Sequence, residues 1–392
     1  MNKRERLSNL SLLNYIFIAV TLLWFILQSF VAFDGFGRIP MSLTIIVFLC
    51  NLSQRVDFSK PPFSYHFVWF LYVVIQGIIF GVAEGYDSFH YHMKLFQVLV
   101  VSYVVCKEFV KDGERTLNYI VWLFAIYMSA GLTTGVENEE NGRMNFDGGN
   151  GFAIMAVPFC FVALLKFIRK EMKLPILLLI LAVVIYIPFV CATRKAFAGI
   201  GIILACVIVS YLDFKSVKSF GVILLMVLAF LGGRALLTDS VLGARFEKES
   251  DSGKSLAQED NFFTDFVGDR TDQYILGWQL FEEHPFTGIG LSNFRKVTQY
   301  SYQLHTEYMV QFAECGIIGV VLFFLYFKKL LKSSLYVFLK QNRHIGALML
   351  GYIMAVLFMC FTAWIHTSNY LFICFGLIMG VYQRYKTFGI KG

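Results

Sequence analysis

The stretch LPILLLILAVVIYIPFVCA, residues 174–192, contains no charged side chain. A helix needs about 20 predominantly apolar residues to cross the hydrocarbon core of a bilayer. Segments of this kind recur along the whole chain, and a soluble core does not need apolar runs of that length. The sequence therefore predicts an all-α polytopic membrane protein.

The composition supports this interpretation. The 392 residues are 57% hydrophobic and 16% charged, whereas soluble domains carry about 25% charged residues. We expect about 12 transmembrane helices, the second of which is either a short span or a re-entrant segment. The expected spans are residues 11–33, 39–53, 63–84, 92–110, 117–134, 150–168, 174–192, 196–213, 219–237, 306–330, 344–365 and 368–384.

Lysines and arginines set the expected orientation. With Lys3, Arg4 and Arg6 in the cytoplasm, most of the 34 basic residues fall in cytoplasmic segments, as the positive-inside rule requires. Both termini are then cytoplasmic. Residues 1–237 hold nine helices, residues 238–305 form a long outer loop with an amphipathic helix in its second half, and residues 306–392 hold three helices.

The same composition argues against several functions. The net charge of +7 comes from basic residues beside apolar runs, so it indicates orientation in the membrane and not nucleic-acid binding. The eight cysteines form no CxxC pair, and His90 and His92 have loose spacing, so we expect no metal site and no cofactor. A transporter would need ionisable residues in several spans, and we find no such chain.

Two arginines are candidates for anion binding at the outer face. Arg194 follows Cys191-Ala192-Thr193 at the outer end of a span. By position alone it is an interface anchor, but an outward-facing basic residue in a short loop runs against the positive-inside rule. Arg270 begins the amphipathic stretch. It either clamps a phosphate with its planar fork or pairs with a neighbouring aspartate such as Asp272.

His305 lies where the outer loop meets the tenth expected span. The positive end of a helix dipole disfavours the protonated ring, so a histidine there can accept a proton as a general base. The alternative is a histidine that only satisfies hydrogen bonds at the interface. Glu307 is the next candidate for a base, and we expect Glu314, deeper in the same helix, to be structural.

Three motifs together resemble the O-antigen polymerase and O-antigen ligase superfamily. The first begins at Arg270 and ends in His-Pro-x-x-Gly-x-Gly (residues 284–290), followed by Asn293-Phe294. The second is His305-Thr306, nine residues, then Gly316-x-x-Gly319. The third is Thr193-Arg194 after an apolar helix, and Gly142-Arg143 is similar to the family's polar entry to the sixth span.

The resemblance implies a metal-independent, inverting membrane glycosyltransferase of GT-C-like architecture in the bacterial inner membrane, with a periplasmic active site. Its donor would be a glycan on undecaprenyl diphosphate and its acceptor a second glycan. It implies catalytic roles for His305, Arg270 and Arg194, and substrate-binding roles for Arg143, Glu307, Tyr274 and Asn293. Preorganised arginines would stabilise the charge of the diphosphate leaving group, and the histidine would accept the proton of the attacking hydroxyl.

Several alternatives stay open at this point. A polymerase, which extends a lipid-linked glycan, is favoured modestly over a ligase, which transfers the glycan to lipid A-core. Binding of a chain-length regulator is left open. A lipid-linked glycan flippase and a non-catalytic scaffold are the alternatives from other classes.

Overall fold

The computed structural model describes residues 3–30, 39–52, 62–81, 88–133, 136–137, 144–145, 150–191, 193–212, 271–299 and 303–388. The expected ninth span at 219–237 and the outer loop as far as residue 270 lie outside these ranges, and so do Arg143 and Arg270. The described residues divide into two compact units. The first contains Met1–Ala130, Gln273–Val337 and Cys360–Gly392, and the second contains Gly131–Asp272 and Phe338–Met359.

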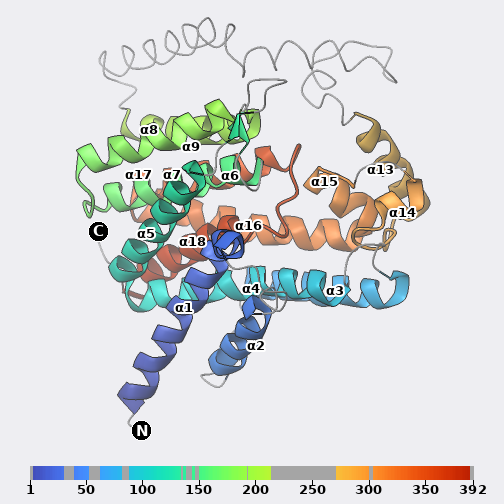
Figure 1. Ribbon diagram of the computed structural model, residues 1–392, viewed down its shortest axis with the longest axis horizontal. Coiled ribbons are helices and arrows are strands. Elements are labelled where there is room, and N and C mark those ends of the chain that lie inside the picture. The colour runs from blue at the N-terminus through green and yellow to red at the C-terminus, as the bar shows by residue number, and fades with distance from the viewer. Residues whose placement is uncertain are drawn as a thin grey trace, which may run out of the picture. The chain divides into compact units, whose positions relative to one another are not determined.

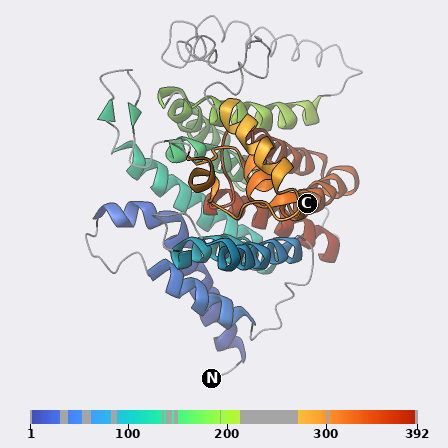
Figure 2. The same ribbon diagram turned by 90° about the vertical axis from the view of Figure 1, so that its right-hand side faces the viewer.

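The first unit is built from helices that come from both ends of the chain. They are α1 (Lys3–Phe30), α2 (Ile39–Leu52), α3 (Phe63–Phe80), α4 (Ser88–Lys111), α5 (Gly113–Leu132), α13 (Thr271–Glu283), α14 (Phe294–Thr298), α15 (Glu307–Met309), the π-helix η3 (Val310–Glu314), α16 (Gly316–Lys340) and α18 (Asn369–Phe388). Both views show α3 beside α4 (Figures 1 and 2), and α4 also packs along α18.

Two glycines explain why α18 can approach α4 so closely. A Cβ on Gly376 would lie 2.3 Å from the carbonyl oxygen of Ser102, and one on Gly380 would lie 2.9 Å from Cβ of Phe109. Gly376 and Gly380 are four residues apart and therefore share one face of the helix. This small-residue spacing lets two backbones meet inside a membrane protein.

The second unit contains α6 (Asn150–Ile154), α7 (Ala156–Ile168), α8 (Leu174–Val190), α9 (Arg194–Tyr211) and α17 (Arg343–Met359). Strands β1 (Val136–Glu137) and β2 (Met144–Asn145) form a two-stranded antiparallel pair in the loop before α6, an addition to the all-helical expectation. Small residues again mark the tightest packing, because Gly199 of α9 faces Val157 and Ala355, and Gly351 of α17 faces Cys206.

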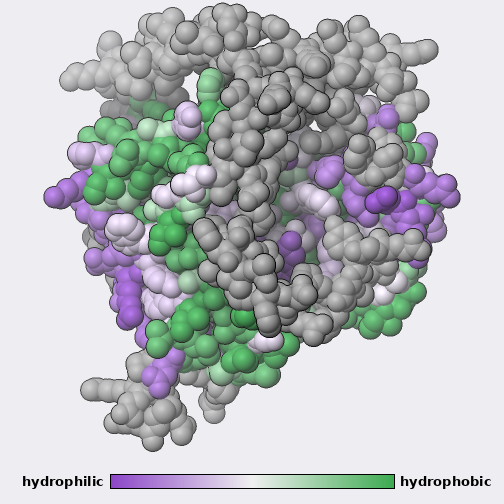
Figure 3. Space-filling view, in the orientation of Figure 1, coloured by the Kyte–Doolittle hydropathy of each residue, from purple (hydrophilic) through white to green (hydrophobic). Residues whose placement is uncertain are grey.

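Apolar side chains cover much of the surface of individual helices. In α8, for example, Leu178, Leu179 and Tyr186 are exposed, and Leu179 is 67% exposed. Figure 3 shows hydrophobic residues gathered over this helix. A soluble protein rarely exposes such a contiguous apolar surface, whereas a lipid-facing helix requires one.

Within the described ranges, three helical segments are long and apolar enough to cross a membrane: Phe63–Phe80, Gly151–Ile168 and Arg194–Tyr211. Four shorter apolar helices accompany them: Asn9–Trp24, Ile39–Leu52, Leu174–Val190 and Arg343–Met359. The chain is thus a helical membrane protein. The total of about 12 spans stays a prediction.

The helices at two expected spans differ in extent from the predicted ranges. The tenth, expected at 306–330, begins as the short α15 and η3 and then continues in α16 as far as Lys340, because lysine and leucine are good helix formers beyond the apolar part. The eleventh, expected at 344–365, ends at Met359. Residues 360–368 are not helical, and the backbone N–H groups of Ile365 and His366 in this segment donate to the carboxylate of Glu307.

Candidate functional site

The turn after α13 docks onto the junction between η3 and α16. Three backbone hydrogen bonds join the two segments, as the N–H of Ile289 donates to Ala313 (3.1 Å), that of Gly290 to Glu314 (2.9 Å) and that of Ile317 to Pro285 (2.8 Å). The π-helical turn makes this possible, because Cys315 donates to Val310, five residues back. Turns of this kind are frequent at functional sites.

Glycine is required on both sides of this contact. Gly288 has φ +66° and Gly316 has φ +63°, a backbone region that other residues rarely adopt. A Cβ on Gly316 would lie 2.5 Å from the carbonyl oxygen of Phe286, and one on Gly288 would lie 2.5 Å from that of Glu314. The glycines of two separate sequence motifs therefore form one packed unit.

Glu314 is structural, as the sequence predicts. It is 2% exposed, and its carboxylate accepts hydrogen bonds from the backbone N–H groups of Ser292 (2.8 Å) and Phe294 (3.2 Å). Ser292 has φ +64°, so the carboxylate holds a strained turn in place. The hydrogen bonds also satisfy carboxyl oxygens whose burial would otherwise be costly.

Helix α3 contributes a polar stripe that the sequence analysis treated as an ordinary span. The hydroxyl of Tyr72 lies within hydrogen-bond distance of the carbonyls of Thr287 (3.0 Å) and Cys315 (2.9 Å) and donates its single hydrogen to one of them. The amide of Gln76 also donates to Thr287 and to Glu314 (3.2 Å). These side chains form hydrogen bonds with backbone carbonyls of the turn and of the end of η3, so α3 stabilises the junction between them.

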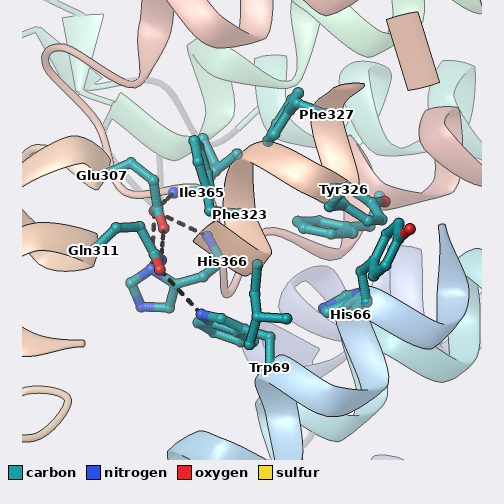
Figure 4. Close-up of a pocket in the computed structure, with 12 residues that line it drawn as sticks. His66, Trp69, Glu307, Gln311, Phe323, Tyr326, Phe327, Ile365 and His366 are labelled. Atoms are coloured by element: carbon teal, nitrogen blue, oxygen red, sulfur yellow. Dashed lines mark hydrogen bonds and ion pairs between the residues drawn. The ribbon is translucent and has the colours of Figure 1, made fainter. Parts of the chain in front are cut away.

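Glu307 is the centre of the site and is fully buried. Its Oε2 accepts hydrogen bonds from the backbone N–H groups of Ile365 (2.7 Å) and His366 (3.3 Å) and from Nδ1 of His366 (2.9 Å). Its Oε1 accepts from the amide of Gln311 (2.8 Å), and Gln311 in turn accepts from the indole of Trp69 (3.0 Å). Figure 4 shows these contacts converging on one carboxylate.

His366 extends this network to α4. Nδ1 of His366 donates to the carboxylate of Glu307, which can only accept. Nε2 of His366 forms a hydrogen bond with the hydroxyl of Tyr91 at 3.0 Å. His366 and Tyr91 were not among the residues predicted from the sequence: His366 follows an apolar run, and Tyr91 stands between two histidines of a short polar segment.

A cavity of about 30 Å³ lies beside Glu307, Gln311 and His366, and is otherwise lined mainly by aromatic side chains (Figure 4). A cavity of this volume has room for water beside the carboxylate of Glu307.

His305 lies at the edge of this network and is half-buried. Thr306 is the N-cap of α15, so His305 immediately precedes the helix, as predicted. Its backbone N–H donates to Oε1 of Gln273 in α13 (2.9 Å), and its ring meets Trp364 edge-on, with centroids 5.3 Å apart. α13 and the 360–366 segment therefore fix the histidine from two sides.

The other predicted residues of this unit have structural contacts. The hydroxyl of Tyr274 donates to the carbonyl of Phe361 (2.6 Å). The amide of Asn293 donates to the carbonyls of Gly81 (3.1 Å) and Ile289 (3.1 Å). Their roles in substrate binding, like that of Glu307, stay predictions.

The predicted arginines lie elsewhere in the chain. Arg194 is the first residue of α9 in the second unit, after the N-cap Thr193, and is half-buried. Arg143 and Arg270 lie outside the described residues. The grouping of Arg194 and Arg270 with His305 stays a prediction.

A family model described as O-antigen ligase matches residues 176–324. This region of the chain is similar to the O-antigen ligase family. It begins in α8, ends in α16 and includes the docked turn, His305 and both glycine motifs. The match confirms the superfamily that these motifs indicated. No curated protein matches the sequence.

The matched region does not contain the whole network. Trp69, Tyr72 and Tyr91 precede it, and His366 follows it. The spacing of Trp69, Tyr72 and Gln76 is the one signal that could have identified α3, because residues three and four apart share a helix face. Among the described residues, no group of three or more metal-ligating side chains comes together.

Proposed function

We propose that the protein is a surface-polysaccharide polymerase. It transfers an undecaprenyl-diphosphate-linked glycan to a sugar hydroxyl of a lipid-linked repeat unit, with inversion and without a metal ion. One observation supports this proposal: the turn at residues 285–290 is hydrogen-bonded to the junction between η3 and α16. Within the matched region, this unit fixes the helix that His305 precedes.

His305 is the general base in this proposal. The attacking hydroxyl has a high pKa and must lose its proton as it bonds to the anomeric carbon. The imidazole accepts that proton while the carbon–oxygen bond to the diphosphate breaks. Glu307 is less suited to this role, because both of its carboxylate oxygens accept hydrogen bonds from buried groups.

Arg194 and Arg270 bind the diphosphate in this proposal. Negative charge grows on the leaving group in the transition state, and preorganised donors stabilise it without further reorganisation. Guanidinium groups suit this task because their planar fork matches two phosphate oxygens at once. In this proposal the protein has about 12 spans in the bacterial inner membrane, and the two arginines bind the diphosphate at its periplasmic face.

The test uses the purified protein in liposomes with a lipid-linked glycan donor. General base catalysis contributes about 10²–10⁴-fold, so His305→Ala should slow transfer by that factor while donor binding persists. His344→Gln is the matched control, because His344 stacks on Tyr211 in the second unit. Wild-type turnover by His305→Ala would contradict the assignment of the base.

A ligase is the second candidate, because the matched family model is described as O-antigen ligase. The same assay separates the two functions by offering either a lipid-linked repeat unit or lipid A-core as acceptor. Deletion in the host gives an independent answer. A polymerase deletion leaves one repeat unit on the core, whereas a ligase deletion leaves long chains on the lipid carrier.

A further inference from the structure

The segment at 360–366 is held by side chains and backbone around His305. The N–H of Glu307 donates to the carbonyls of Cys360 (2.9 Å) and Ala363 (3.2 Å). Its carboxylate accepts from the N–H groups of Ile365 and His366. One residue thus binds both ends of a short non-helical segment, which we call the clamp loop (residues 360–366).

Two tyrosines add to this attachment. The hydroxyl of Tyr274 in α13 donates to the carbonyl of Phe361 (2.6 Å), and the ring of Tyr308 packs edge-on against the ring of Phe361 at 4.7 Å. A loop with this many fixed points presents its remaining side chains in a defined geometry. Trp364 lies between the fixed positions Ala363 and Ile365.

Trp364 in turn contacts the ring of His305. The two ring planes are at 87° with centroids 5.3 Å apart, a T-shaped contact that aromatic rings prefer over face-to-face stacking. The backbone of His305 is already fixed by Gln273. The indole therefore limits the remaining freedom, which is rotation of the imidazole about its side-chain bonds.

We propose that Trp364 and Glu307 are positioning residues for the imidazole of His305. Glu307 fixes the clamp loop, the loop fixes Trp364, and Trp364 orients the ring that accepts the proton. This inference rests on the proposed function, since it needs His305 to be the base. In this model Glu307 acts through the clamp loop and does not need to contact the substrate.

The experiment combines Trp364→Ala with His305→Ala in the liposome transfer assay. A misplacement of about 1 Å can cost about 10²-fold in rate, so Trp364→Ala should lower kcat by up to that factor and leave KM near the wild-type value. Trp364→Phe should restore most of the rate, because it keeps an aromatic ring at this position. In the His305→Ala background, Trp364→Ala should cause no further loss, since residues that act as a unit are not additive.

Trp278→Ala is the matched control, because this tryptophan lies on the exposed face of α13 and its indole donates to Glu282 (2.7 Å). An additional loss from Trp364→Ala in the His305→Ala background, or a rise in KM alone, would overturn the inference. Wild-type turnover by Trp364→Ala would overturn it as well. Failure of the proposed function is a different result, in which His305→Ala alone transfers glycan at the wild-type rate.

Discussion

Gly316→Ala should destabilise the protein strongly, because two penalties coincide at one position. A residue with a Cβ at φ +63° costs about 1–3 kcal/mol. The new Cβ would also lie 2.5 Å from the carbonyl oxygen of Phe286 and 2.6 Å from the nitrogen of Gly288, and neither backbone atom can swing away. Moving the turn would break the bond from Ile317 to Pro285, worth about 1 kcal/mol. The free energy of unfolding should therefore fall by about 2–4 kcal/mol.

The measurement is the apparent thermal midpoint of the purified protein in one detergent, at one heating rate. Gly201→Ala is the control, because no atom of the described residues lies within 4 Å of a Cβ built there, and alanine in a helix interior stabilises by about 0.5–1 kcal/mol. We expect Gly316→Ala to melt several degrees below wild type and Gly201→Ala at or above it. Equal midpoints for the two variants would show that the turn is not docked on α16 in the way described.

Three further predictions test other parts of the molecule. Reporter fusions at Lys170 and Lys332 should read cytoplasmic by the positive-inside rule, and an external reading at Lys332 would put His305 on the wrong side of the membrane. Arg194→Ala should abolish glycan transfer while the protein still inserts into the membrane. Arg194→Lys should restore only part of the transfer, because lysine lacks the planar fork of the guanidinium group. Normal surface glycan on a gel for the alanine variant would show that this arginine is only an interface anchor. Glu307→Ala should lower the apparent melting temperature, because each buried donor left unsatisfied costs about 1–3 kcal/mol, and an unchanged midpoint would contradict the hydrogen-bond network drawn around it.

Much of the fold follows from apolar runs alone. The run at 39–53 corresponds to the helix Ile39–Leu52 and the run at 174–192 to Leu174–Val190. An apolar segment within a bilayer has no water to bond its backbone, so it forms internal hydrogen bonds. The same argument did not predict the clamp loop, which lies at the end of the span expected at 344–365. The loop contains neither glycine nor proline, and hydrophobicity cannot distinguish a buried loop from a buried helix.

Residues of the candidate site could be predicted from the sequence where a polar residue lies at the boundary of an apolar segment. His305, Glu307 and Glu314 were found in this way, and the structural role of Glu314 is confirmed by its bonds to Ser292 and Phe294. His366 was not found, because its importance comes from a carboxylate 59 residues away in the sequence. A local sequence pattern cannot predict that two residues 59 positions apart will form a hydrogen bond.

The pairing of Glu307 with His366 also has a consequence for how the chain is made. At about 5–20 residues per second, the 59 residues between them take roughly 3–12 s to synthesise. During that interval Glu307 has been synthesised and His366 has not. A carboxyl group that lacks this partner either stays in contact with water or takes up a proton. The complete network around Glu307 therefore forms only after the segment that contains His366 has been made.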